Sequence, residues 1–145
     1  MDRKNIIEWV AIISWLGDII IWMISHQMVI NYTQKNLQSI YKYLYGYESH
    51  YRKKLNMYET IFMTSIANVI FYQYHLIYKR KGYFPMFKKG KGSMYPNLNE
   101  ETALLLIKNN YKWLVLNVVS LGLGFFWFFG STLFMLLAKR AGTGS

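Results

Sequence analysis

The chain of 145 residues contains no cysteine and two prolines, and its acidic residues are few. The absence of cysteine excludes disulfide bonds, thiolate metal sites, cysteine-ligated iron–sulfur clusters and a cysteine nucleophile. Hydrophobic residues make up 53% of the chain and aromatic residues 19%. A mixture this apolar is too hydrophobic for intrinsic disorder, so we expect a folded protein.

Seven acidic residues stand against 17 lysines and arginines, which gives a formal net charge of +10. A basic chain suggests nucleic acid as a partner, but here the basic residues lie between apolar runs. Anionic lipid headgroups attract basic residues at such positions. We therefore expect contact with anionic lipids or partner proteins, and no nucleic acid. The predicted contact residues are Arg52, Lys53, Lys54, Lys79, Arg80 and Lys81.

The longest apolar run extends from Trp113 to Leu137, and it contains neither a charged residue nor a proline. A helix needs about 20 apolar residues to cross the hydrocarbon core of a bilayer. Lys108 and Lys112 precede the run, and Lys139 and Arg140 follow it, so both ends can meet water or headgroups. The sequence predicts a transmembrane helix here.

A second apolar run extends from Ile6 to Ile30, and Asp18 lies near its middle. The run resembles a signal peptide, but Asp18 interrupts it and no small-residue cleavage site follows, so we expect it to be retained. As a helix, 25 residues are about 37 Å long, which is enough to span with some tilt.

Small and polar residues form a stripe along each predicted span, as is usual where membrane helices approach closely. In the first span the stripe holds Ala11, Ser14, Asp18 and Ser25, while Trp9, Trp15, Ile19 and Trp22 are predicted to lie away from it. In the second it holds Asn117, Ser120, Gly124 and Ser131. The predicted helix–helix interface residues are Ser14, Asp18, Asn117, Ser120 and Gly124.

The segments between the two runs are more polar. Tyrosine and leucine recur at helical spacing among basic residues from 37 to 58, which predicts a basic amphipathic helix with Gly46 as a break. The segment Ile61–Ile77 is apolar but contains Thr64, Asn68, Gln73 and His75. Polar residues near the centre of a span are costly to insert, so a third span remains open.

Residues 79–96 contain both prolines, three glycines and six basic residues, which predicts a loop. Asn97 or Asn99 then caps a helix that starts near Leu98, bends at Asn109–Asn110 and continues into the long apolar run. We expect a single all-α membrane domain over residues 1–145, with two to three transmembrane helices and the amphipathic helix.

Catalytic and metal-binding patterns are missing from the sequence. The histidines are His26, His50 and His75, and antiparallel spans would hold His26 and His75 on opposite faces of the bilayer. We expect no enzymatic activity and no cofactor other than structural phospholipids such as cardiolipin. Asp18 is either a proton relay or a structural residue that hydrogen-bonds at a helix contact; without a second buried acid or base, we favour the structural role.

These observations favour a non-catalytic accessory subunit of a large hetero-oligomeric membrane complex of the mitochondrial respiratory chain type. The preference for lysine over arginine, 13 to 4, and the abundance of Ile, Asn, Tyr and Phe are typical of an AT-rich genome and favour the mitochondrial inner membrane. The alternative is a small self-assembling, holin-like pore or a toxin-immunity protein in a bacterial plasma membrane. A small transporter or membrane enzyme is the weakest hypothesis, since no coupling or catalytic residues are apparent.

Overall fold

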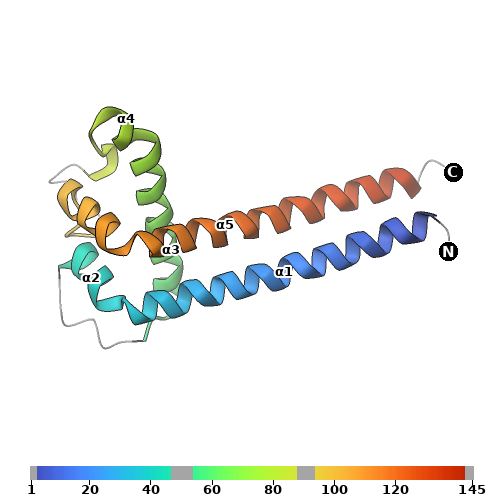
Figure 1. Ribbon diagram of the computed structural model, residues 1–145, viewed down its shortest axis with the longest axis horizontal. Helices are drawn as coiled ribbons and strands as arrows, with labels where there is room; N and C mark the ends of the chain where they lie inside the picture. The colour runs from blue at the N-terminus through green and yellow to red at the C-terminus, as the bar shows by residue number, and fades with distance from the viewer. Residues whose placement is uncertain (1–2, 47–53, 88–93, 143–145) are drawn as a thin grey trace. The chain divides into compact units, whose positions relative to one another are not determined.

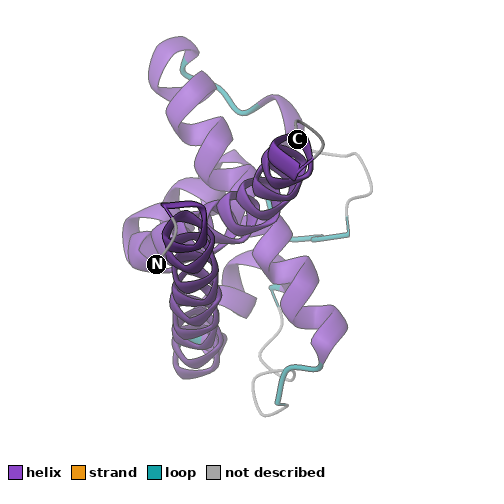
Figure 2. Ribbon diagram, turned by 90° about the vertical axis from the view of Figure 1, so that its right-hand side faces the viewer, coloured by secondary structure: helices purple, strands orange, loops and turns teal. Residues whose placement is uncertain are grey.

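The computed structural model describes residues 3–46, 54–87 and 94–142. Every element in these ranges is helical (Figures 1 and 2), which confirms the predicted all-α class. The elements are α1 (Arg3–Lys35), α2 (Leu37–Tyr45), α3 (Met57–Gln73), a π-helix (Tyr74–Tyr78), α4 (Lys79–Lys81), a 3-10 turn (Pro85–Phe87) and α5 (Glu100–Gly142).

The chain divides into two compact units. The paired-helix unit consists of Met1–Gln27 and Val119–Ser145, and the central unit consists of Met28–Val118. Both long helices, α1 and α5, contribute to both units. The single membrane domain expected over the whole chain stays a prediction.

Two helices in the described ranges are long and apolar enough to cross a membrane: Glu8–Lys35 within α1 and Glu100–Phe134 within α5. In the most apolar window of α1 no residue is buried, and in that of α5 only 17% are buried. The core helix of a soluble domain would bury its apolar side chains against other elements. Both predicted spans therefore lie in helices that have the length and composition of a span and whose apolar side chains are mostly not buried in the described structure.

The predicted amphipathic segment over 37–58 breaks at Gly46, as its sequence indicated, and its first part forms α2. Helix α2 ends at Tyr45, because Gly46 takes a left-handed conformation with φ of 75° that stops the helix. Residues 47–53 lie outside the described ranges. A new helix, α3, begins at Met57 with a capping box, in which the Asn56 side chain accepts from the Glu59 backbone and the Glu59 carboxylate accepts from the Asn56 backbone.

The segment Ile61–Ile77 forms most of α3 and the π-helix. It is not one of the two helices that have the length and composition of a span. One face of α3 instead packs into the central unit through Met63, Ile66, Ala67 and Ile70. A third transmembrane helix therefore gains no support from the structure.

Half of the described part of the predicted loop over 79–96 is helical, in α4 and in the 3-10 turn, and the other half is irregular. Of the two candidate caps, Asn99 starts α5: its side-chain oxygen accepts from the Thr102 backbone. Asn97 has a different role, since its amide donates to the Lys42 carbonyl near the end of α2. The segment before α5 is thus fastened to α2.

The bend predicted at Asn109–Asn110 is confirmed, because Asn110 has non-helical backbone angles inside α5 (φ −131°, ψ 33°). Both asparagine side chains hydrogen-bond to α2. Asn110 donates to the Ser39 hydroxyl at 3.0 Å, and Asn109 donates to the Tyr43 hydroxyl. These two hydrogen bonds to α2 stabilise the bend in α5, because each is made by a side chain at the bend itself.

The core of the central unit extends into the predicted second span. Trp113 and Leu114, the first residues of the long apolar run that was predicted to span a membrane, are fully buried there. The Trp113 indole Nε1 donates to the Thr33 hydroxyl of α1 at 2.9 Å, and Thr33 donates to the Val29 carbonyl at 2.7 Å. This buried chain of hydrogen bonds joins α5 to α1 within the central unit.

Three tyrosines form a second part of this core. The Tyr45 ring lies 4.9 Å from that of Tyr41 and 5.5 Å from that of Tyr95, whose hydroxyl donates to the Phe62 carbonyl. Burial and the nearby Glu59 carboxylate raise the pKa of Tyr41 to about 12, and the pKa values of Tyr45 and Tyr95 are raised as well, mainly by burial. All three hydroxyls therefore stay protonated at neutral pH.

Replacing Thr33 with valine tests the buried hydrogen-bond chain. The substitution keeps the volume but leaves the Trp113 N–H buried without an acceptor, which costs about 1–3 kcal/mol. We expect thermal unfolding of the full chain in mild detergent, followed by near-UV circular dichroism, to shift to lower temperature. The matched control is Thr60→Val, which removes a solvent-accessible hydroxyl bond to the Asn56 carbonyl. Equal shifts for the two variants would contradict the proposed role of Thr33.

Candidate functional site

The paired-helix unit is built on a close contact between α1 and α5, which lie side by side there (Figure 1). A Cβ atom added at Gly124 would lie 2.8 Å from the indole Nε1 of Trp22, so the indole occupies space that only glycine leaves open. Further along, the rings of Trp15 and Trp127 stack with their centroids 5.7 Å apart. Residue numbers rise along α1 as they fall along α5, so the two helices are antiparallel.

The contacts correct the predicted interface on α1. Trp15 and Trp22 were expected to lie away from the contact stripe, but both pack against α5. The contacting face follows Ala11, Trp15, Asp18 and Trp22 at steps of four, three and four residues. The prediction for Gly124 agrees with this geometry, since the glycine admits the Trp22 ring.

A hollow of about 220 Å³ lies between α1 and α5 beside the Trp15–Trp127 stack. Asp18 and Ser14, two of the predicted interface residues, line it. The other lining residues are Ala11, Trp15, Phe126, Trp127, Gly130, Ser131 and Phe134. Asp18 is partly exposed, and among the described residues its carboxylate makes no hydrogen bond or ion pair. Asp18 is therefore the one acidic residue among those that line the hollow, and most of the other lining residues are apolar.

Three hydroxyl groups of the paired-helix unit are paired within their own helices. Ser25 donates to the Trp22 carbonyl, Ser131 to the Trp127 carbonyl, and Thr132 to the Phe128 carbonyl. The buried Nε1 of Trp127 has no hydrogen-bond partner. It is a second unpaired polar group in a residue that lines the hollow.

The remaining predicted interface residues, Asn117 and Ser120, are both buried. Asn117 belongs to the central unit, where its amide donates to the Trp113 carbonyl at 2.7 Å and its side-chain oxygen has no partner. Ser120 belongs to the paired-helix unit and is 4% exposed. The polar stripe predicted on the second span thus faces inward in both units.

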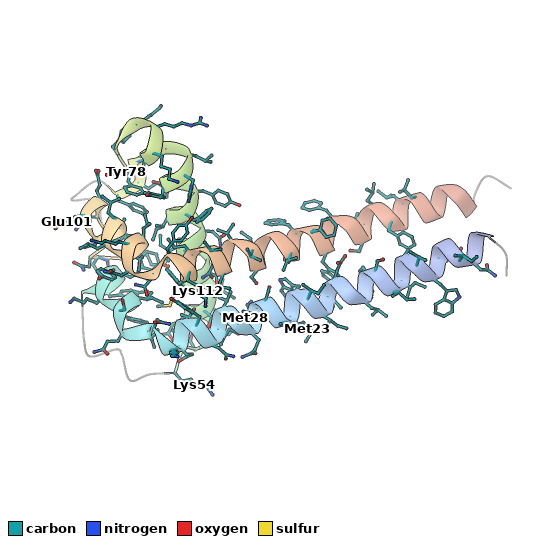
Figure 3. The ribbon with its side chains drawn as sticks, in the orientation of Figure 1. Met23, Met28, Lys54, Tyr78, Glu101 and Lys112 are labelled. Carbon is teal, nitrogen blue, oxygen red and sulfur yellow. The ribbon has the colours of Figure 1, made fainter. Side chains whose placement is uncertain are left out.

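The outer sides of the paired helices carry large exposed apolar side chains (Figure 3). On α1 these include Trp9, Val10, Ile13, Ile20, Met23 and Ile24, and on α5 they include Phe125, Phe126, Phe128, Phe129, Leu133 and Leu136. Many are more than half exposed, and Ile13 and Phe126 reach 65%. A soluble monomer rarely exposes a continuous apolar surface of this kind.

Of the predicted lipid or partner contacts, Lys54, Lys79, Arg80 and Lys81 are exposed on the central unit. Arg52 and Lys53 lie outside the described residues. Three of the exposed residues form α4, which directly follows the π-helix. Their charges are therefore concentrated on one short turn of helix.

His75 lies on the π-helix beside this turn, within an aromatic group that includes Phe71, Tyr74 and Tyr111. Its Nδ1 lies 3.2 Å from the Lys79 ammonium, and its Nε2 lies 3.3 Å from the Tyr111 hydroxyl. Burial and the Lys79 charge lower the pKa of His75, so the imidazole is neutral at pH 7. Because an ammonium can only donate, Nδ1 accepts and the ring proton lies on Nε2.

His26 stacks on Trp22 in the paired-helix unit, whereas His75 belongs to the central unit. Over residues 3–46, 54–87 and 94–142, no three His, Cys, Asp or Glu side chains are grouped closely enough to hold a metal ion. The features that sequence reasoning missed are the Trp22–Gly124 contact, the Thr33–Trp113 hydrogen bond and the His75–Tyr111 pair. Each joins residues that are far apart in the chain, and no local pattern marks them.

Comparison with protein-family models, with curated proteins and with solved structures finds no match to this chain. A function for this chain can therefore be inferred only from its own sequence and structure.

The two glycines Gly122 and Gly124 provide a matched test of the helix contact. A Cβ at Gly122 would meet no atom within 4 Å, whereas one at Gly124 would meet Trp22. Gly124→Val should push the helices apart at a cost of about 1–3 kcal/mol, as expected for an overpacked contact. Gly122→Val should change little.

The helix separation can be measured by cross-linking, because the chain has no native thiol. Ala11→Cys and Ser131→Cys place two thiols around the same hollow, where a short bis-maleimide can join them. We expect Gly124→Val to lower the cross-linked fraction and Gly122→Val to preserve it. The same yield from both variants would show that Gly124 does not set the helix approach.

Proposed function

We propose that this protein is a non-catalytic accessory subunit of a large membrane complex, anchored in the bilayer by its paired helices. The observation that carries the proposal is the apolar outer surface of the paired-helix unit. Large apolar side chains are exposed on both helices, and each helix also has the length and composition of a membrane span. Lipid and neighbouring membrane subunits are the surroundings that would cover such a surface favourably.

The length of the exposed apolar segment fits a bilayer. Val119–Leu137 is the part of the second apolar run that lies outside the central unit, and it holds 19 residues. At 1.5 Å per residue it is about 28 Å long, close to the hydrocarbon thickness of about 30 Å. In α1 the segment from Ile6 to Gln27 is slightly longer, which allows for tilt.

The central unit supports a role in assembly rather than chemistry. Its buried side chains are mainly apolar and aromatic, and they form a well-packed core. Of the chain's net charge of +10, residues 31–112 carry +9, from 13 basic and four acidic residues. The exposed turn Lys79–Lys81 would bind anionic phospholipid headgroups or an acidic partner surface at about 1 kcal/mol per charge.

We propose the mitochondrial inner membrane as the location and a respiratory, electron-transport type of assembly as the complex. The composition of the chain supports this choice. A self-assembling pore is a poorer fit, because a conducting pore needs a continuous polar lining. Ser25, Ser131 and Thr132 instead direct their hydroxyls to carbonyls of their own helices.

Phe128→Arg tests the membrane location. Phe128 is the middle residue of Val119–Leu137 and its side chain is 59% exposed, so a large effect on packing within the unit is not expected. An arginine near the centre of a span costs about 2.5–3.5 kcal/mol on insertion scales. We expect carbonate to extract the Phe128→Arg protein from membranes, while Phe128→Leu remains embedded. Equal retention of both variants would argue against a bilayer around this segment.

The role as an accessory subunit is tested by native electrophoresis after mild solubilisation of the membrane that contains the chain. We expect the 17.3 kDa chain to migrate in an assembly several times its own mass. A denaturing second dimension followed by mass spectrometry should show several different subunits in that assembly. A ladder made of this chain alone would favour the pore, and a monomer would contradict both hypotheses.

A further inference from the structure

Asp18 lines the hollow without a hydrogen-bond partner among the described residues, as does the buried Nε1 of Trp127. A serine or threonine hydroxyl donates to a carbonyl one turn earlier, as Ser131 and Thr132 do. An ionised carboxylate can only accept, and the backbone N–H groups around it are already used within α1. Asp18 therefore needs a donor from outside its helix, and none of the described residues supplies one.

We propose that a transmembrane helix of another subunit packs against the open side of the hollow and inserts a lysine, arginine or protonated histidine side chain that meets the Asp18 carboxylate. The inference rests on the proposed accessory role and names the chemistry of the partner. A charged side chain at membrane depth is costly, and such groups usually pair with one another or with backbone groups. Charge complementarity thus selects a basic partner side chain.

The walls of the hollow suit a helix. Ala11, Ser14, Gly130 and Ser131 line it and are all small, so the backbone of a third helix can come close. A Cβ at Gly130 would meet no atom within 4 Å, which leaves that side of the hollow open. The aromatic rings of Trp15, Phe126 and Phe134 supply the apolar contacts around it.

A second copy of this chain does not meet the requirement. The apolar runs Ile6–Ile30 and Trp113–Leu137 contain no lysine or arginine that could meet Asp18. Their one histidine, His26, lies about two turns from Asp18 and stacks on Trp22. Two copies inserted in the same direction would also bring their Asp18 carboxylates to the same depth, where like charges repel.

A lipid headgroup does not meet it either. Asp18 lies 12 residues from Ile6 and nine from Gln27, the two ends of the α1 segment in the paired-helix unit. Along the helix axis these separations are about 18 Å and about 14 Å, so Asp18 lies near the middle of a hydrocarbon core about 30 Å thick. An acyl chain reaches this depth but carries no hydrogen-bond donor.

Site-specific photo-cross-linking in the native membrane tests the proposal. A benzoyl-phenylalanine is placed at Gly130, which lines the hollow, and as a matched control at Ile13, which is 65% exposed and does not line it. We expect the Gly130 probe to give an adduct with an apolar segment of another subunit that carries a basic residue near the cross-linked position. The Ile13 probe should give mainly lipid adducts.

Asp18 variants then connect the adduct to the carboxylate. Asp18→Asn keeps the size of the side chain and removes its charge, and we expect the adduct yield to fall about tenfold or more. Asp18→Glu, which keeps the charge, should restore most of it. An unchanged yield for Asp18→Asn would overturn the proposal. So would a Gly130 adduct with lipid only, with a second copy, or with a segment that has no basic residue.

Failure of this inference is distinguishable from failure of the proposed function. If the chain migrates in a large hetero-oligomer but the Gly130 probe labels only lipid, the docking inference is contradicted and the accessory role is not. If the chain migrates alone, both the accessory role and the docking inference are contradicted.

Discussion

The close approach of α1 and α5 at Gly124 determines the geometry of the paired-helix unit. Lipid surrounds apolar side chains as favourably as a neighbouring helix does, so membrane helices need close packing to hold together. The Trp22 indole gains that packing because position 124 has no side chain. With this contact fixed, the Trp15–Trp127 stack follows two turns along α1, and both of these tryptophans line the hollow together with Asp18.

The sequence predicted both long apolar helices and the small residue at their contact, but it misassigned Trp15 and Trp22. The spacing of the small and polar residues predicted that both tryptophans lie away from the contact stripe. Whether an indole faces lipid or a neighbouring helix depends on the space that the neighbour leaves, and periodicity within one helix contains no such information. Gly122 and Gly124 illustrate the same point, since they are alike in the sequence while only Gly124 contacts a tryptophan.

In the central unit, local signals were the most predictive. The Asn99 cap, the bend at Asn110 and the break at Gly46 all depend on side chains or backbone angles near the position itself. The burial of Trp113 could not be predicted in the same way, because hydropathy does not distinguish an apolar residue in lipid from one in a protein core. Its partner Thr33 lies 80 residues away, in a segment that was expected to be a polar connection.

The two units satisfy their polar groups differently, and this difference bears on assembly. In the central unit, hydrogen bonds from Trp113 to Thr33 and from Asn110 to Ser39 join different helices, and each constrains how those helices pack. In the paired-helix unit, Ser25, Ser131 and Thr132 bond to their own helices, which satisfies the groups without specifying a neighbour. In a bilayer, bonds within one segment would pair these hydroxyls without any neighbouring helix. The exposed apolar side chains of both helices make no part of these bonds. The central unit therefore has a packing that its own side chains specify, whereas the outer faces of the paired helices would be free to contact the lipid and the subunits of the proposed complex.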